Sequence, residues 1–350
     1  MKKYFFKYGI RIAIPLIMIL LLQLVSVRII NAVPDQKANL SWGGKKYAQV
    51  SCLSSKEDSF TTDELRKYEY AMNQTGKWTD AYSGKGKLTV TNGNAQVDGV
   101  VYGVGNDFFT FHPLELLSGG YIDSDNVMKD YIMLDEESAW QLFGSDDVAG
   151  MSVEINGERY IVSGVYKREG SGFHKAAGNG EITFYICWEA LEKMDDTAAI
   201  TFYEFIMENP VRQYAYDFAV KNLVQDDNDA QDNKKKTETK ERTMIENSDR
   251  YSVSNTWNRL KNFGKNAMDL DEIAYPYWEN VARAYSSILC LILAAQIVSG
   301  AVIVIVVFSA GIRLYRKRKD GFEWIKAKGR AVVQKITKKN KEKGLTKAKV

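Results

Sequence analysis

Histidine, cysteine and proline are scarce in this chain, which has 2, 3 and 5 of them among 350 residues. His112 and His174 are the only imidazoles, and neither C-x-x-C nor H-E-x-x-H occurs, so a histidine-rich metal site is not expected. Three cysteines do not make a disulfide framework. A bridge between Cys52 and Cys187 and buried free thiols are the two alternatives that the sequence leaves open.

The chain also lacks the motifs of nucleotide hydrolysis and of serine hydrolases. No G-x-x-x-x-G-K-[ST] occurs, so we do not expect the chain to hydrolyse nucleotide itself. Phe108 stands where a dinucleotide-binding loop beginning at Gly103 would need its third glycine, and no serine has a G-x-S-x-G context. We predict that the chain is not an enzyme and uses no cofactor. An anchored hydrolase that employs His112 or His174 is the weakest alternative.

Acidic charge is missing from the N-terminus and rare at the C-terminus, although the net charge of the chain is only +3. Residues 1–11 carry four basic residues and no acidic one, and residues 316–350 carry 14 basic residues against 3 acidic ones. The residues between these ends are net negative. Because positively charged segments stay in the cytoplasm when a membrane protein inserts, this separation indicates cytoplasmic ends and an exported middle.

Two long apolar stretches fit that topology. Residues 10–30 contain charges only near their ends, and residues 286–310 contain none. At a rise of about 1.5 Å per residue, either stretch can cross a hydrocarbon core of about 30 Å. A cleaved signal peptide is disfavoured for the first stretch because its apolar core would be too long. We predict a two-pass protein of the plasma (inner) membrane, with a cytoplasmic N-terminus at 1–9, transmembrane helices at 10–30 and 286–310, an extracytoplasmic domain at 33–284 and a basic cytoplasmic tail at 311–350.

The exported segment has the pattern of an α+β domain with two lobes. The dipeptides that begin at Asn92 and Asn156 are Asn-Gly, and each separates two β-rich runs, which predicts two β-hairpins. Thr61 and Glu64 predict a capping box at the start of a helix that runs to about Asn73. Strands are also expected at 47–53, 131–134, 181–187, 201–207 and 251–254, and helices at 136–143, 188–193, 211–223 and 255–263.

Two further segments have unusual charge. Residues 226–250 include 14 charged residues, which predicts a solvated loop or frayed helix or, alternatively, an arm that docks a partner. The basic tail mixes apolar residues with its charges as far as Ile336, which favours an amphipathic helix, and from Lys338 onward we expect disorder. Beside a membrane, such a tail favours anionic lipids or a cytoplasmic protein over nucleic acid as its partner.

Short motifs follow one another in a characteristic order between Val104 and Val165. They are Leu117-Ser118-Gly119-Gly120, Ile132-Met133-Leu134-Asp135, Leu142-Phe143-Gly144, Ile155-Asn156-Gly157 and Tyr160-Ile161-Val162-Ser163-Gly164-Val165. In this order they resemble the extracytoplasmic core domain of MacB-like ABC transporter permeases. The arrangement of helix, large domain and helix extends the resemblance over most of the chain.

The tail adds a second resemblance. Ile325-Lys326-Ala327-Lys328-Gly329 is similar to the cytoplasmic segment after the first helix of the FtsX-like permease module, with Lys326 in place of an arginine. Gly321 departs from the pattern, because an acidic residue is expected there. In that family the region borders the ATPase. The resemblance therefore implies an ATPase-contact segment made of Glu323, Trp324, Ile325, Lys326, Ala327 and Gly329.

Together the two resemblances imply a non-catalytic membrane subunit of a MacB/FtsX-like ABC transporter complex. A partner ABC ATPase would move the extracytoplasmic domain for export or transmembrane signalling, and the short lead from Ile273 into the second helix suits such a lever. Family permeases continue with two more membrane helices that we do not find after residue 310, so a full-length permease or a second copy of the chain is expected to complete the membrane module. The alternative is a membrane-anchored extracellular sensor or adhesion module without ATPase coupling.

Overall fold

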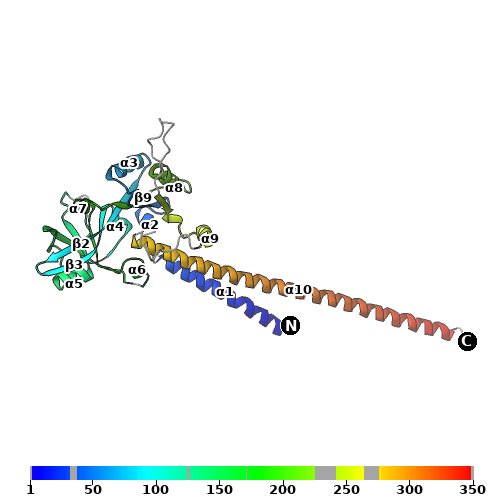
Figure 1. The fold of residues 1–350 in the computed structure, drawn as a ribbon. Helices are drawn as coiled ribbons and strands as arrows, with labels where there is room; N and C mark the ends of the chain where they lie inside the picture. Colours follow the sequence, from blue (N-terminus) through cyan, green and yellow to red (C-terminus); the bar gives the residue numbers. More distant parts are fainter. Residues whose placement is uncertain are drawn as a thin grey trace. The chain divides into compact units, whose positions relative to one another are not determined.

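The structure is a computed structural model that describes residues 2–31, 38–123, 127–170, 172–224, 242–263 and 276–347 (Figure 1). The chain forms two compact units. Unit 1 consists of Met1–Ser26 and Ile292–Val350, and unit 2 consists of Val27–Leu291.

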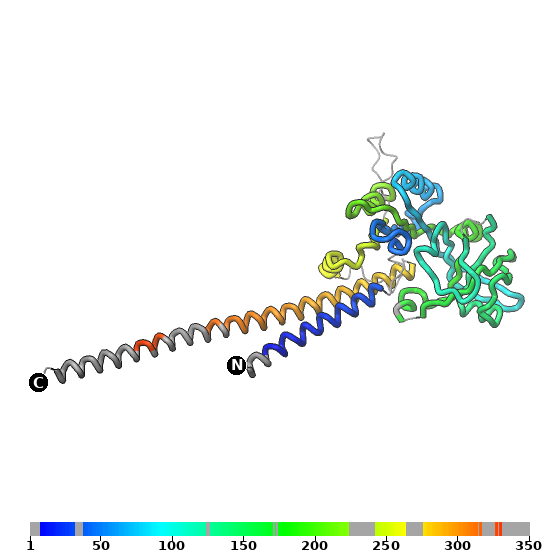
Figure 2. The backbone as a smooth tube through the Cα atoms, turned by 180° about the vertical axis from the view of Figure 1, so that it is seen from behind, coloured from blue at the N-terminus to red at the C-terminus, as the bar shows by residue number. Residues whose placement is uncertain are grey.

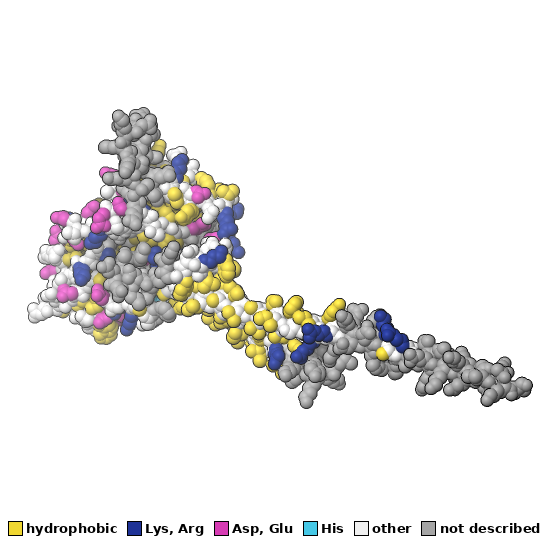
Figure 3. Space-filling model, turned by 45° about the vertical axis from the view of Figure 1, so that its right-hand side comes forward, with side chains coloured by type: hydrophobic (Ala, Val, Ile, Leu, Met, Phe, Trp, Pro, Cys, Tyr) yellow, Lys and Arg dark blue, Asp and Glu magenta, His cyan; other side chains and the backbone are white. Residues whose placement is uncertain are grey.

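Unit 1 is built from α1 (Lys2–Asn31) and the larger part of α10 (Tyr277–Lys347). Among the described residues, two helical stretches are long and apolar enough to cross a membrane, Tyr8–Asn31 and Tyr277–Arg313, and they contain the predicted spans 10–30 and 286–310. Exposed apolar side chains cover much of the surface of both helical stretches (Figure 3). The Gln296 side-chain amide donates to Oε1 of Gln23 at 3.2 Å, a polar link of the kind that joins helices in lipid.

Unit 2 contains a mixed sheet of ten strands in the order β10-β1-β9-β2-β3-β8-β5-β7-β4, with β6 paired to β2 and β7. The β3–β8 and β5–β7 pairs are parallel, and the other pairs are antiparallel. The strands are β1 (Tyr47–Ser54), β2 (Trp78–Asn92), β3 (Ala95–Asn106), β4 (Glu115–Gly119), β5 (Tyr131–Asp135), β6 (Ser152–Ile155), β7 (Glu158–Lys167), β8 (Thr183–Cys187), β9 (Ile200–Glu208) and β10 (Arg242–Glu246).

Short helices pack around this sheet. In both backbone views α3 and α8, which are far apart in sequence, lie side by side at one end of the domain (Figures 1 and 2). The α-helices are α2 (Ala38–Trp42), α3 (Thr62–Met72), α4 (Phe108–Phe111), α5 (Glu136–Phe143), α6 (Gly172–Ala176), α7 (Trp188–Met194), α8 (Tyr214–Ala219) and α9 (Val253–Lys261). A π-helix, η2 (Val220–Val224), extends α8, and a 3-10 turn, η4 (Asn247–Asp249), follows β10.

Local signals in the sequence are confirmed. The β2–β3 hairpin turns at Asn92 and Gly93, where Gly93 has a positive φ of 59°. Thr61 caps α3 in a full capping box, because its side chain accepts from the Glu64 amide while the Glu64 carboxylate accepts from the Thr61 amide. Gly144 ends α5 in the left-handed conformation. The α+β class is therefore confirmed, and the strands expected in two lobes form one sheet.

Buried apolar side chains cover both faces of the sheet. Cys52 belongs to the cluster on one face and its strand neighbour Leu53 to the cluster on the other, as the alternation along a strand requires. Cys187 belongs to the second cluster, so the two cysteines lie on opposite faces and the disulfide alternative is wrong. Burial raises the pKa of Cys52 to about 12 and that of Cys187 to about 11, so both thiols stay protonated.

The charged-loop prediction for 226–250 is corrected in its second part, and residues 226–241 lie outside the described residues. Arg242–Glu246 forms the edge strand β10, which pairs with β1. The Arg242 guanidinium is buried, donating to the Leu223 carbonyl at 2.8 Å and lying 4.0 Å from the Phe60 ring centroid. The number of charged residues alone could not predict the burial of Arg242, because backbone carbonyls and an aromatic ring replace water around its guanidinium group.

The chain after β10 also differs from expectation. The strand predicted at 251–254 is absent from the structure, since Ser252 is the N-cap of α9 and its hydroxyl accepts from the Asn255 amide at 3.2 Å. At the C-terminus, the helical backbone of α10 continues to Lys347 where disorder was predicted from Lys338. The lysines there are good helix formers, which a prediction from charge alone neglects.

Candidate functional site at the start of helix α10

The first two turns of α10 are buried inside unit 2. Trp278 is 2% exposed and Glu279 is 1% exposed. Asn280 and Ala282 are fully buried, and the Asn280 amide donates to the Ala177 carbonyl at 3.3 Å. Successive residues of a helix point to different sides, so the domain surrounds the start of this helix rather than touching one face of it.

Aromatic side chains from three elements surround the Trp278 indole. The ring centroid of Trp278 lies 5.2 Å from that of Tyr102 in β3, 5.6 Å from Phe108 in α4 and 5.5 Å from Phe202 in β9. The Phe108 and Phe202 rings are close to perpendicular to the indole, the edge-to-face arrangement that aromatic pairs favour. The indole is therefore fixed to the sheet and to the helix α4 at the same time.

A buried histidine and a buried glutamate lie beneath the indole. The His112 ring packs against the Trp278 ring at a tilt of 40° with centroids 4.5 Å apart, and His112 Nε2 lies 2.5 Å from Glu204 Oε1. Oε2 of Glu204 accepts from the Gln49 amide at 3.1 Å and from the Ser51 hydroxyl at 3.3 Å. His112 follows α4 as its C-cap. Its partner Glu204 comes from β9, and no spacing in the sequence links the two residues.

Glu279 forms the other half of the site with two arginines. Arg250 donates to both carboxylate oxygens of Glu279 at 2.6 and 2.8 Å, and Nε of Arg283 donates to Oε1 at 2.9 Å. All three side chains are buried. Arg250 lies between η4 and α9, so this bidentate pair joins the chain that follows β10 to the start of α10.

The arginine cluster borders a cavity of about 340 Å³ that Arg259 of α9 also lines. Burial and the nearby Arg250 both lower the pKa of Arg259. Asp249 lies at the same cavity, with Arg212 as its partner at 2.9 Å. Three guanidinium groups therefore converge around the single buried carboxylate of Glu279.

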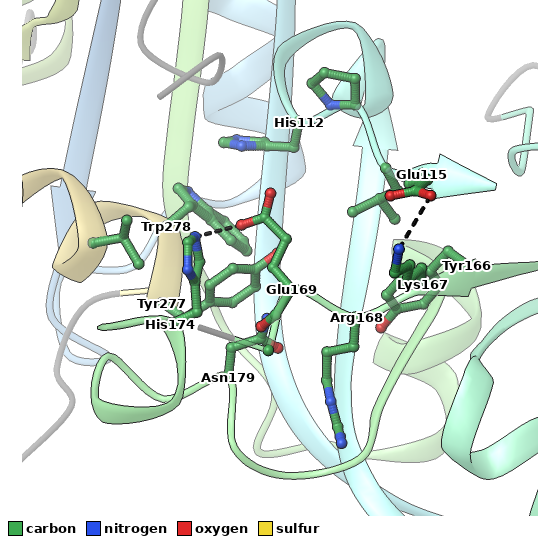
Figure 4. A pocket seen from close by; sticks show the side chains of 14 residues that line it. His112, Glu115, Tyr166, Lys167, Arg168, Glu169, His174, Asn179, Tyr277 and Trp278 are labelled. Carbon is green, nitrogen blue, oxygen red and sulfur yellow. Dashed lines mark hydrogen bonds and ion pairs between the residues drawn. The ribbon is translucent and has the colours of Figure 1, made fainter. Parts of the chain in front are cut away.

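A second cavity, of about 190 Å³, lies on the other side of Trp278, between the end of β7, helix α6 and α10 (Figure 4). Its titratable side chains pair with one another: Lys167 Nζ lies 3.4 Å from Glu115, and His174 pairs with Glu169. The hydrogen bond from His174 lowers the pKa of Glu169. His174 lies in the short helix α6, within a glycine-rich stretch of the chain.

The described residues contain no group of three or more histidine, cysteine, aspartate or glutamate side chains that could hold a metal. The buried Asp135 caps α5 by accepting from the Ser138 amide at 2.8 Å. Its other oxygen accepts from Arg168 at 2.9 Å and from the Thr183 amide at 3.1 Å. These hydrogen bonds hold β5, α5 and β8 together.

The predicted ATPase-contact segment lies in α10 within unit 1, far along the chain from the buried turns. Its backbone is helical. Lys326, Ala327 and Gly329 are exposed, and the side chains of Glu323, Trp324 and Ile325 lie outside the described part of the structure. The segment stays a prediction.

The family model described as the MacB-like periplasmic core domain matches residues 16–223. Among solved structures, the extracellular domain of the noncanonic ABC-type transporter YknZ from Gram-positive bacteria is similar, with 15% identity over 49% of this chain and 87% of that chain and a TM-score of 0.36. The periplasmic region of MacB from Actinobacillus actinomycetemcomitans has 12% identity over 61% of this chain and 94% of that chain, with a TM-score of 0.39. No curated protein matches the chain.

Proposed function

We propose, from the premise that the chain belongs to the family of the MacB-like periplasmic core domain, that it is a non-catalytic membrane subunit of a MacB/FtsX-like ABC transporter complex. A partner ABC ATPase moves the extracytoplasmic domain through α10, for export or for signalling across the membrane. The charge separation along the sequence supports cytoplasmic termini and an extracytoplasmic domain.

The observation that carries the proposal is the burial of the first turns of α10 inside unit 2. The same helix continues through the charge-free segment 286–310 to the basic residues beyond Arg313 without a break. An α-helix is held by hydrogen bonds along its whole length, so a displacement applied at one end is passed on along its axis. In this chain the receiving end is held by Trp278 and Glu279, whose partners come from the sheet and from the η4–α9 segment.

The pairing of titratable groups supports a non-catalytic role. Lys167, Glu169, His174 and Arg168 at the smaller cavity each have a charged partner. A catalytic acid, base or nucleophile needs access to a substrate atom, whereas these side chains are engaged with one another. The cavity is therefore better suited to packing around α10 than to chemistry.

The test is purification of the full chain from its native membranes in mild detergent. An ABC ATPase should accompany the chain, and removal of residues 316–336 should abolish the association because that segment includes the predicted contact. Removal of residues 338–350 serves as the matched control and should leave the association intact. If no ATPase is recovered, or if recovery survives the loss of 316–336, the sensor or adhesion module without ATPase coupling becomes the better account.

A further inference from the structure

Helix α9 exposes a line of apolar side chains on the surface of unit 2. Val253, Trp257 and Leu260 follow one another at the i, i+4, i+7 spacing that places residues on one helical face. Val253 is 74% exposed, Trp257 is 43% exposed, and Phe263, just after the helix, is 54% exposed. Contiguous exposed apolar groups of this kind mark a surface that another apolar phase covers.

The side of α9 next to the apolar line packs on α10 where the apolar segment of α10 begins. Thr256 is buried, and its carbonyl accepts a hydrogen bond from Sγ of Cys290 at 3.5 Å. Cys290 lies four residues beyond Ser286, the first residue of the charge-free segment, which corresponds to about 6 Å along a helix. Helix α9 is thus level with the first turn of α10 that would enter lipid.

Polar and basic groups lie beside the apolar line. Ser254 and Asn258 form a neighbouring exposed line, and Lys261 Nζ lies 5.4 Å from the centroid of the Trp257 ring. An indole next to a lysine suits the membrane interface, where the ring sits among headgroups and the ammonium reaches the phosphates.

We propose that α9 is an amphipathic helix that lies in the interface of the extracytoplasmic leaflet of the plasma membrane. Val253, Trp257 and Phe263 then lie in the headgroup–acyl boundary, and Lys261 lies at the lipid phosphates. The occupant of the apolar face is the bilayer, because the contact with Cys290 holds the helix at the depth where lipid begins. The helix then fixes the height of the domain above the membrane. This holds whether or not an ATPase drives the chain.

The test uses the full chain reconstituted into vesicles of neutral and anionic phospholipid, with a nitroxide label at V253C or at S254C. The two positions are adjacent and both exposed, and the native cysteines are buried, so the variants form a matched pair. Collision of each label with dissolved oxygen and with a water-soluble nickel complex is measured. The label at 253 should be shielded from nickel and accessible to oxygen, whereas the label at 254 should stay accessible to nickel.

Quenching by brominated lipids gives an independent reading. Tryptophan fluorescence of the wild-type chain should lose more intensity on bromolipid than that of W257F, because the Trp257 indole contributes to the loss. Equal nickel access at 253 and 254 would overturn the proposal, and so would bromolipid quenching that is unchanged in W257F. Shielding of position 253 from both oxygen and nickel would overturn it in favour of a protein contact.

Discussion

Replacement of Glu279 by glutamine tests directly whether the buried ion pairs at the start of α10 stabilise the domain. The substitution keeps the shape of the side chain and removes its charge. Arg250 and Arg283, which donate three hydrogen bonds to the Glu279 carboxylate, are then left buried without a counter-charge. Loss of one partner from a buried ion pair costs about 3–5 kcal/mol of unfolding free energy. For a domain of this size, each kcal/mol lowers the melting temperature by about 2–4 °C, so we expect a fall of about 6–20 °C.

The assay is thermal unfolding of the full chain in detergent, followed by near-ultraviolet circular dichroism. Hydrogen exchange of the η4 and α9 amides should also become faster, because Arg250 joins that segment to α10. Arg212→Gln is the matched control, since it removes an ion pair between the exposed Arg212 and the partly exposed Asp249, and such surface pairs contribute at most about 1 kcal/mol. A fall no larger for Glu279→Gln than for Arg212→Gln would refute the reasoning.

Three further predictions concern the interior of unit 2. Trp278→Ala empties the space that the indole fills and should cost about 3–5 kcal/mol in the same unfolding assay, and a loss below 1 kcal/mol (roughly that of a surface change) would contradict the packing. Burial raises the pKa of Asp80 to about 7 from 3.8. The folded state therefore binds the Asp80 proton more tightly than the unfolded state does. The unfolding free energy should decrease by about 4 kcal/mol as pH rises from about 4 to 7. Asp80→Asn should remove most of that pH dependence, and an unchanged slope would argue against it. Thiol titration of the denatured, non-reduced chain should find Cys52 and Cys187 free, whereas a mass lower by two hydrogens would indicate a bridge.

Elements whose signals are local could be predicted from the sequence. The Asn92-Gly93 turn, the Thr61 capping box and the stop at Gly144 depend on backbone chemistry within a few residues, and the structure has each of them. The family resemblance also rested on short local motifs of glycines and turns. These motifs lie within residues 16–223, which the family model matches.

The first half of β2 could not be predicted in this way. Residues 78–86 include Gly84 and Gly86, which are poor strand formers, and no strand was expected there. Glycine is required at position 84 because other segments pack closely against the backbone there. A Cβ on Gly84 would overlap the Trp188 ring and the Ala199 carbonyl. Packing between distant segments decides this strand, and a local pattern does not report it.

The candidate site could not be predicted from the sequence either, because its residues come from segments that are far apart along the chain. Glu279 lies in the short lead to the second membrane helix, whereas its partner Arg250 lies in a segment that its charge had led us to interpret as solvated. His112 and Glu204 are 92 positions apart, and only the fold brings them to 2.5 Å. A sequence gives the inventory of charges, whereas pairing across the fold decides which of them are buried.

The most direct test of the central claim is site-specific photocrosslinking in native membranes. A photoreactive amino acid is placed at Ala327, within the predicted ATPase-contact segment, and in a second variant at Lys341 as the control on the same helix. We expect position 327, and not position 341, to crosslink to a protein that carries the nucleotide-binding motifs of an ABC ATPase. Crosslinks at position 327 only to lipid or to another copy of the chain would contradict it.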